Sequence, residues 1–315
     1  MATVPAWLRR AIPDAQSVVD KNVEDMALVA GAAIGALDAV VRRQERWAGA
    51  WRQRLALSAA AVTARQAGRV EDEAGLRDAV LLTKADDDVG PAGRMLLAWG
   101  RLATRTNEDL LTGRNLDAVL KEFGYAPDDA AISGLADELR QLSTAGMVEM
   151  LTGAFITAER YGFGRAVGAW LADALVAQRL DWTHAVPLLG AEVSAGLGAN
   201  RPRRSGTIPS ATSIEDEGVR AKSLLAAQAR AALRAVDLAA ELERRSERLL
   251  AVAPKLRARA SDLVVERLLS DDAIVASEKI AGMSDRGLRR LFDRLQKLGA
   301  VRELSGRPTF RIYGL

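Results

Sequence analysis

Residues 284–315 read SDRGLRRLFDRLQKLGAVRELSGRPTFRIYGL, a pattern that predicts a capped basic helix followed by a β-hairpin. Ser284 can accept a backbone hydrogen bond at the helix start, and Gly299 is placed to end the helix. The helix therefore has one apolar stripe to bury. The residues of this stripe recur at helical spacing and are Leu288, Leu291, Phe292, Leu295 and Leu298.

The opposite face of this helix is basic. At 100° per residue, Arg286, Arg290 and Lys297 lie opposite the apolar stripe, and Arg289 lies at its flank. Residues 275–315 hold nine basic and four acidic residues, a local balance of +5 against +3 for the whole chain. Positive charge is thus concentrated on a helix whose shape suits a duplex groove.

The sequence around this helix predicts a winged helix-turn-helix domain over residues 255–315. Ser261–Leu269 is expected as its first helix, Ser277–Ala281 as a short second helix and Ser284–Leu298 as the third. Two short β segments, Val301–Leu304 and Thr309–Tyr313, flank the turn residues 305–308. Three helices and a small β-hairpin complete the pattern.

In such a domain the third helix enters the major groove of double-stranded DNA. Arg286 and Arg290 are one turn apart and can read neighbouring base pairs, and Arg307 at the hairpin tip is expected to reach adjacent phosphates or the minor groove. Two alternatives stay open: a solvated face on which Asp293 neutralises Arg290, or a protein-interaction domain. The predicted DNA-binding residues are Ser284, Arg286, Arg289, Arg290, Lys297, Arg302, Arg307 and Arg311.

The rest of the chain predicts a mainly α fold. Hydrophobic residues make up 49% of the 315 positions, and helical patterns run almost without interruption from Val23 to Gly196. We expect a multi-helix domain over residues 1–198 and a linker or long loop over 199–218, which holds Pro202 and Pro209. A long connector helix over 219–254 should then lead to the C-terminal domain. This helix could also form the seam of a homodimer, although its alanine-rich pattern does not decide this.

Composition also bears on location. The chain has no cysteine, which excludes disulfides and thiolate metal sites and agrees with a reducing compartment. Its most apolar run, Ala27–Leu37, is shorter than the roughly 20 residues that span a bilayer. The N-terminus lacks the apolar core of a signal peptide. We therefore expect a cytoplasmic protein without a membrane span.

Catalytic equipment is sparse. His184 is the only histidine, so a metal site with several histidines is excluded, and a lone histidine near a loop is more simply structural. The acidic run Asp86–Asp88 lacks the spaced ligands of a calcium loop, and helix capping explains it more simply. We expect no metal, no cofactor and no catalytic residue.

The segment Gly162-Phe163-Gly164-Arg165 precedes the apolar helix 166–178, and two glycines with an arginine at a helix start can present N–H groups to a phosphate. Here the chain is similar to Fic-domain proteins, in which a His-Pro-Phe-X-(Asp/Glu)-Gly-Asn-Gly-Arg loop lies between two helices and a winged helix often closes the chain. The resemblance puts Thr157 at the catalytic histidine and Tyr161 at the metal-binding acid. It therefore implies a degenerate scaffold with a phosphate-sized pocket around Gly162, Gly164 and Arg165. The alternative is a tight turn between two packed helices.

Over its whole length the chain resembles an uncharacterised bacterial family often found on plasmids and in mobile regions. The resemblance implies no established activity. The segments that carry it are 47–57 (WAGAWRQRLAL), 73–79 (EAGLRDA), 170–175 (WLADAL) and the ending from Met283 to Leu315.

Taken together, these patterns lead us to expect a non-enzymatic DNA-binding regulator, of transcription or of a mobile element. Its N-terminal helices would sense a small ligand or a protein partner. A catalytically degenerate Fic-like nucleotide-binding scaffold and a protein-interaction adaptor are the alternatives.

Overall fold

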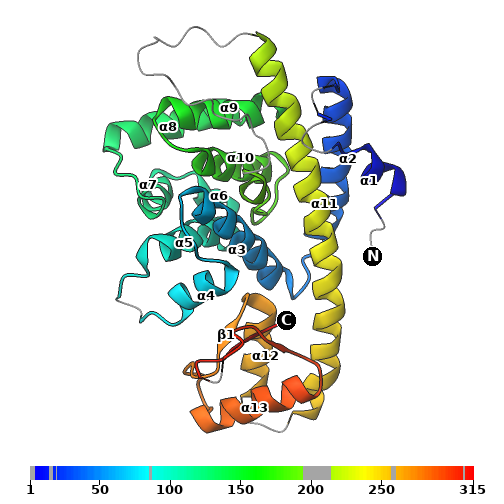
Figure 1. Ribbon diagram of the computed structural model, residues 1–315, viewed down its shortest axis with the longest axis vertical. Coiled ribbons are helices and arrows are strands. Elements are labelled where there is room, and N and C mark those ends of the chain that lie inside the picture. Colours follow the sequence, from blue (N-terminus) through cyan, green and yellow to red (C-terminus); the bar gives the residue numbers. More distant parts are fainter. Residues whose placement is uncertain are drawn as a thin grey trace.

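The computed structural model describes residues 4–13, 17–18, 20–84, 87–193, 214–256, 260–307 and 309–315. The fold is mainly helical with a small three-stranded antiparallel sheet near the C-terminus, which confirms the expected fold class (Figure 1). Within these residues no helix is both long enough and apolar enough to cross a membrane. The elements before the C-terminal region are α1 (Ala6–Ala11), α2 (Val23–Val41), α3 (Ala48–Gln66), α4 (Glu73–Leu81), α5 (Gly90–Thr104), α6 (Asn107–Leu110), α7 (Gly113–Glu122), α8 (Asp129–Leu142), α9 (Met147–Arg160), α10 (Arg165–Arg179), η1 (Leu189–Glu192), α11 (Ile214–Val252) and η2 (Ala253–Lys255).

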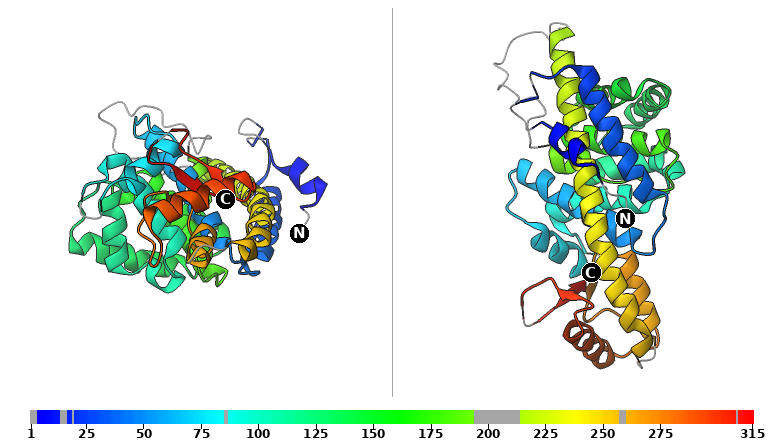
Figure 2. Two further views of the ribbon diagram at one scale, coloured as in Figure 1. Left: turned by 90° about the horizontal axis from the view of Figure 1, so that it is seen from below. Right: turned by 90° about the vertical axis from the view of Figure 1, so that its right-hand side faces the viewer.

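The longest helix, α11, runs along one side of the molecule with α2 beside it (Figures 1 and 2). Its inner face is rich in alanine, and Ala227, Ala232 and Ala235 are fully buried, which lets neighbouring helices approach closely. Trp51 on α3 fills part of the space and donates from Nε1 to the carbonyl oxygen of Ala235 at 2.9 Å. The helix begins at Ile214, whereas the sequence pattern placed its start at residue 219. Most of the expected linker, residues 199–213, lies outside the described residues.

The helical body, which comprises α1 to α10, η1 and the adjoining part of α11, is built around α3 and α10. Trp99 and Trp170 are fully buried between its helices. Trp99 donates from Nε1 to Thr63 Oγ1 at 3.1 Å, and Trp170 donates to the Ala98 carbonyl oxygen at 3.0 Å. Each indole thus fills a gap left by small neighbours and satisfies its one polar atom.

The C-terminal lobe, residues 260–307 and 309–315, contains α12 (Ser261–Ser270), β1 (Ile274–Val275), α13 (Asp285–Lys297), β2 (Arg302–Glu303) and β3 (Ile312–Gly314). Its strands are antiparallel in the order β1-β3-β2, so β3 is central. Tyr313 lies opposite Ile274 on one side and Glu303 on the other. The ring of Tyr313 stacks on Phe292 of α13 at a centroid distance of 4.4 Å, which joins the sheet to the helix.

The expected short helix at Ser277–Ala281 is wrong, because this segment forms turns. Ala276 N–H donates to the Arg311 carbonyl oxygen at 2.8 Å, which prolongs the pairing of β1 with β3. Glu278 N–H then donates to the Val275 carbonyl oxygen at 3.0 Å, a turn hydrogen bond. Five residues would gain a single i to i−4 bond, too little to offset the cost of starting a helix.

The lobe and the body share one continuous hydrophobic core. Leu288, Leu291, Phe292 and Leu295 of α13 are at most 3% exposed, as the apolar stripe predicted, whereas Leu298 is 49% exposed. In the views of Figures 1 and 2 the lobe lies at one end of the long axis, with α13 at its outer edge. The opposite face of α13 is therefore turned away from the body.

Candidate nucleic-acid interface

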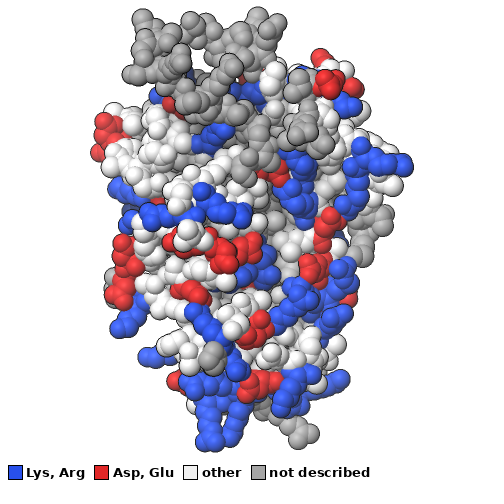
Figure 3. All heavy atoms as spheres, in the orientation of Figure 1, with Lys and Arg blue, Asp and Glu red and all other residues white. Residues whose placement is uncertain are grey.

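The outer face of α13 carries the cations that the sequence places there. Ser284 caps the helix, and its Oγ accepts a hydrogen bond from the Gly287 N–H at 3.2 Å. Figure 3 shows Lys and Arg atoms gathered at the lower end of the molecule, where Figure 1 places α13. The helix thus buries one side and presents a basic side to solvent. The exposed cations of this region are Arg286, Arg289, Arg290, Arg294, Lys297, Arg302 and Arg311.

Most of these cations are not neutralised by a neighbour. Among the described residues, no carboxylate lies within ion-pair distance of Arg286, Arg290 or Lys297. Asp293 lies 3.9 Å from Arg311 on the hairpin, so the structure does not show the alternative in which Asp293 neutralises Arg290. Arg294 differs from the others, because its Nη2 donates to the Lys255 carbonyl oxygen at 3.2 Å. The basic face is therefore available to an external anion.

The expectation that Arg307 joins this face is wrong. Its guanidinium forms an ion pair with Asp78 of α4, and its side chain is only 33% exposed. Its Nε is buried and has no partner. The reason is tertiary: the hairpin loop lies against α4, so its tip meets the body and not open solvent. Of the predicted residues on the hairpin, only Arg302 and Arg311 are exposed.

Sequence reasoning missed Phe310, which lies beside the basic face. Phe310 is 64% exposed and adopts a left-handed backbone with φ of 51°. With Arg289, Asp293 and Arg311 it lines a pocket of about 370 Å³ between α13 and the hairpin. The sequence could not predict that Phe310 is exposed, because the alternation of a regular strand would put it on the same side as the buried Ile312. Because Phe310 is left-handed, β3 begins only at Ile312, whereas the predicted β segment began at Thr309.

At the turn between α9 and α10, the N–H groups of Gly162, Phe163 and Gly164 are used within the chain. Gly162, with φ of 76°, donates to the Glu159 carbonyl oxygen at 3.0 Å, and Phe163 donates to the Ala158 carbonyl oxygen at 2.8 Å. These two bonds form a Schellman motif, the usual end of a helix at a glycine. Gly164 N–H donates to Tyr125 Oη at 2.6 Å. The expected phosphate site at Gly162, Gly164 and Arg165 therefore lacks its main donors, and the tight-turn alternative describes the segment.

The described residues offer no group of three or more acidic or histidine side chains that could hold a metal ion. In the acidic run, Asp88 Oδ1 accepts from the Gly90 N–H at 2.9 Å, whereas the N-cap residue of α5 is Val89, which makes no side-chain capping bond. Asp86 lies outside the described residues. His184 is half-buried in the segment that follows α10.

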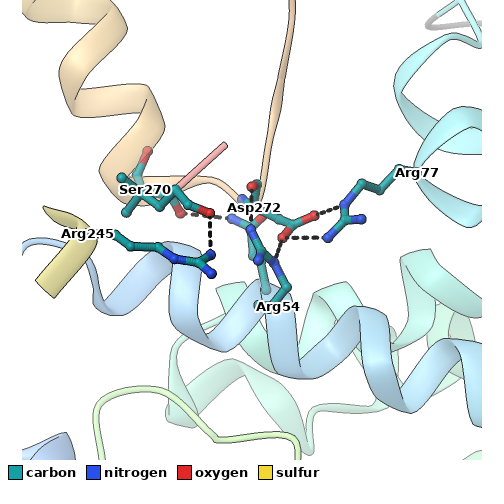
Figure 4. Close-up of polar contacts among 7 residues, drawn as sticks. Arg54, Arg77, Arg245, Ser270 and Asp272 are labelled. Atoms are coloured by element: carbon teal, nitrogen blue, oxygen red, sulfur yellow. Dashed lines mark hydrogen bonds and ion pairs between the residues drawn. The ribbon is translucent and has the colours of Figure 1, made fainter. Parts of the chain in front are cut away.

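A buried ionic cluster attaches the lobe to the body (Figure 4). Asp272, between α12 and β1, accepts from Arg54 of α3 and from Arg77 Nε of α4, the latter at 2.5 Å. Burial alone would raise the pKa of Asp272, but the two guanidinium groups outweigh it and lower the pKa. Arg245 of α11 donates to the Leu315 carbonyl oxygen at 2.9 Å. We call Asp272, Arg54 and Arg77 the junction.

A close contact beside the junction also fixes which face of the lobe is covered. Gly49 packs so closely on α12 that an added Cβ would lie 2.4 Å from the Ser270 carbonyl oxygen. Gln53 Nε2 donates to the same oxygen at 3.0 Å. The sequence could not indicate this contact, because its residues are over 200 positions apart and follow no local pattern. The lobe is thus held in one orientation, with α13 facing outward.

Comparison with known proteins supplies a family. No curated protein matches the chain, so this comparison shows no similarity to Fic-domain proteins. Residues 1–315 match a family described as "Protein of unknown function (DUF1403)", and the chain therefore belongs to this uncharacterised family.

Proposed function

We propose that the chain is a non-enzymatic DNA-binding protein that regulates transcription or a mobile element in the cytoplasm. The observation that carries this proposal is the outer face of α13, on which Arg286, Arg290 and Lys297 are exposed and have no acidic partner among the described residues. A face of this kind attracts phosphates, because their counterions are released when the cations bind.

In this proposal the lobe is a winged helix in which a turn replaces the second helix. The order α12, β1, α13, β2, β3 supports this interpretation. Helix α13 would enter the major groove, and Arg286 and Arg290, one turn apart, would contact base edges. Arg289, Lys297, Arg302 and Arg311 would contact phosphates, and Arg307 has no role because it is paired with Asp78.

Salt dependence tests the proposal directly. Fluorescence anisotropy would follow binding of a labelled mixed-sequence duplex between about 50 and about 200 mM salt, where phosphate binding weakens steeply. The double variant Arg289→Ala/Lys297→Ala removes two of the proposed phosphate contacts and should make the slope of log K against log salt less steep by about 2, since each lost phosphate contact removes about one released counterion.

A matched control separates a local from a general charge effect. Arg69 and Arg114 are exposed on other parts of the body, and Arg69→Ala/Arg114→Ala removes the same net charge. This control should leave the slope unchanged. Equal slopes for both double variants, or no binding by the unaltered protein at low salt, would overturn the proposal. Binding of DNA without any salt slope would equally contradict it.

The two alternatives have less support. A protein-interaction adaptor would use the same exposed face but show no affinity for the duplex. A degenerate Fic-like nucleotide scaffold is favoured by no contact, because the N–H groups of Gly162, Phe163 and Gly164 are all used within the chain.

A further inference from the structure

A second pocket lies in the body beside the α12 end of the lobe, and no residue of α13 lines it. It has a volume of about 370 Å³ and is formed by the end of α2, the start of α3, residues 181–186 and Ser270 of α12. Apolar residues are prominent in its lining and include Val40, Val41 and Val186 together with Trp47, Trp51 and Trp182, each of which presents only a small part of its surface. The pocket therefore has apolar walls and a size within the usual range for small ligands.

Arg52 supplies an unneutralised charge in this pocket. Its Nε donates to the Ala103 carbonyl oxygen at 2.9 Å, and no carboxylate of the described residues lies within ion-pair distance. Burial lowers the pKa of Arg52 to about 10, so the guanidinium stays protonated at neutral pH. Arg52 is partly buried, and an external anion would offset the cost of desolvating its charge.

The other charged residues of the pocket cannot supply this counterion. Glu45, one of the two acids in the lining, forms an ion pair with Arg43 outside the pocket. Asp181, the remaining acid in the lining, is exposed. Arg52 is therefore a cation of the pocket lining that an anionic ligand could neutralise.

His184 lines the same pocket and is a second polar group. Burial and the nearby charge of Arg52 lower its pKa, so the imidazole is neutral at neutral pH and can donate one N–H. The backbone before it is held in place, because Asn107 N–H donates to the Thr183 carbonyl oxygen at 2.9 Å. Arg52 and His184 thus provide donors for an anionic group.

We propose that this pocket binds a small organic carboxylate, with the carboxylate at Arg52 and His184 and its apolar part against the apolar lining residues. A planar guanidinium matches a carboxylate in a bidentate fashion, and one cation balances one negative charge. The apolar walls favour a ligand with a hydrocarbon or aromatic portion. The site does not rest on DNA binding, and its contact with Ser270 places the ligand next to the α12 end of the lobe.

The single histidine makes the test specific. In the unaltered 315-residue chain, NMR would follow the titration of the one imidazole signal with benzoate, with neutral benzamide and with inorganic phosphate. Bound benzoate should raise the pKa of His184 in a saturable way, because a nearby anion stabilises the imidazolium. Benzamide and phosphate should have little effect. No saturable shift with benzoate, or an equal shift with benzamide or phosphate, would overturn the assignment.

Two variants with the same charge change provide the control. Arg52→Gln should weaken benzoate binding about tenfold or more in calorimetry, because the ligand loses its buried charge partner. Arg69→Gln removes an exposed cation that does not line the pocket, and it should change the affinity less than about twofold. Equal losses in both variants would contradict the role of Arg52. If Arg52→Gln does not fold, the NMR comparison on the unaltered protein decides.

Discussion

Replacing Asp272 with Asn tests whether the junction holds the lobe to the body. The change keeps the shape of the side chain and removes its charge, so Arg54 and Arg77 lose their common partner. All three side chains are deeply buried, with exposed fractions of 12% for Asp272, 14% for Arg54 and 9% for Arg77. Breaking a buried ion pair from one side costs about 3–5 kcal/mol, because the remaining charges stay buried without compensation. This is a large share of a typical free energy of unfolding of about 5–15 kcal/mol.

Urea unfolding of both proteins would measure this loss. Asp237→Asn is the control, because Asp237 also pairs with an arginine, Arg9, but the two side chains are 54% and 46% exposed. Such an exposed pair contributes at most about 1 kcal/mol. Hydrogen exchange should locate the effect of the Asp272 change in α12 and β1 to β3 and leave α9 and α10 protected. A loss for Asp272→Asn as small as that of the control, or one spread evenly over the body, would refute the reasoning.

Three further changes have expected outcomes. The two arginine partners lower the pKa of Asp272, so the carboxylate stabilises the fold above its ordinary pKa of 3.8 and loses this effect as the pH falls below 3.8. The difference in unfolding free energy between the unaltered protein and Asp272→Asn should therefore shrink in acid unfolding curves. Gly49→Ala should lower the thermal midpoint strongly, because the new Cβ would collide with the Ser270 backbone. Gly31→Ala has open space at its Cβ and should stabilise α2 by about 0.5–1 kcal/mol. Equal shifts for the two glycine changes would contradict this. Ser284→Ala should lower the free energy of unfolding by about 1 kcal/mol, because α13 loses its N-cap. An unchanged denaturant midpoint would show that this cap does not stabilise the protein.

The sequence predicted those parts of the fold whose structure depends on local patterns. The apolar stripe of α13, its Ser284 cap and the Gly299 at its end all follow from spacing within one helix, and each is seen in the structure. The long helix after the linker was also predicted, with a start that differs by five residues. In contrast, the turn at 277–281 depends on backbone pairing with β3, a contact that helix propensity does not include.

The interface was predictable in its charge and less so in its geometry. Arg286, Arg289 and Arg290 are exposed because they share a helix with a buried stripe, and that relation is visible in the sequence. Arg307 was misplaced because its partner, Asp78, lies on a distant helix. The junction at Asp272 and the unneutralised Arg52 were missed for the same reason, since burial of a charge is a property of tertiary packing.

The length of α11 has a mechanical consequence. Its 39 residues span about 58 Å at 1.5 Å per residue. Near one end Arg220 pairs with Glu159 of α9, and near the other end Arg245 donates to the carbonyl oxygen of Leu315 in the lobe. A rigid rod of this size is a lever: a pivot of about 5° at one end moves the other end by about 5 Å. That displacement exceeds the rise of about 3.4 Å between successive nucleotides along a DNA strand. Because the junction also ties the lobe to α3 and α4, a pivot of this size would first have to break the contacts of Asp272 with Arg54 and Arg77.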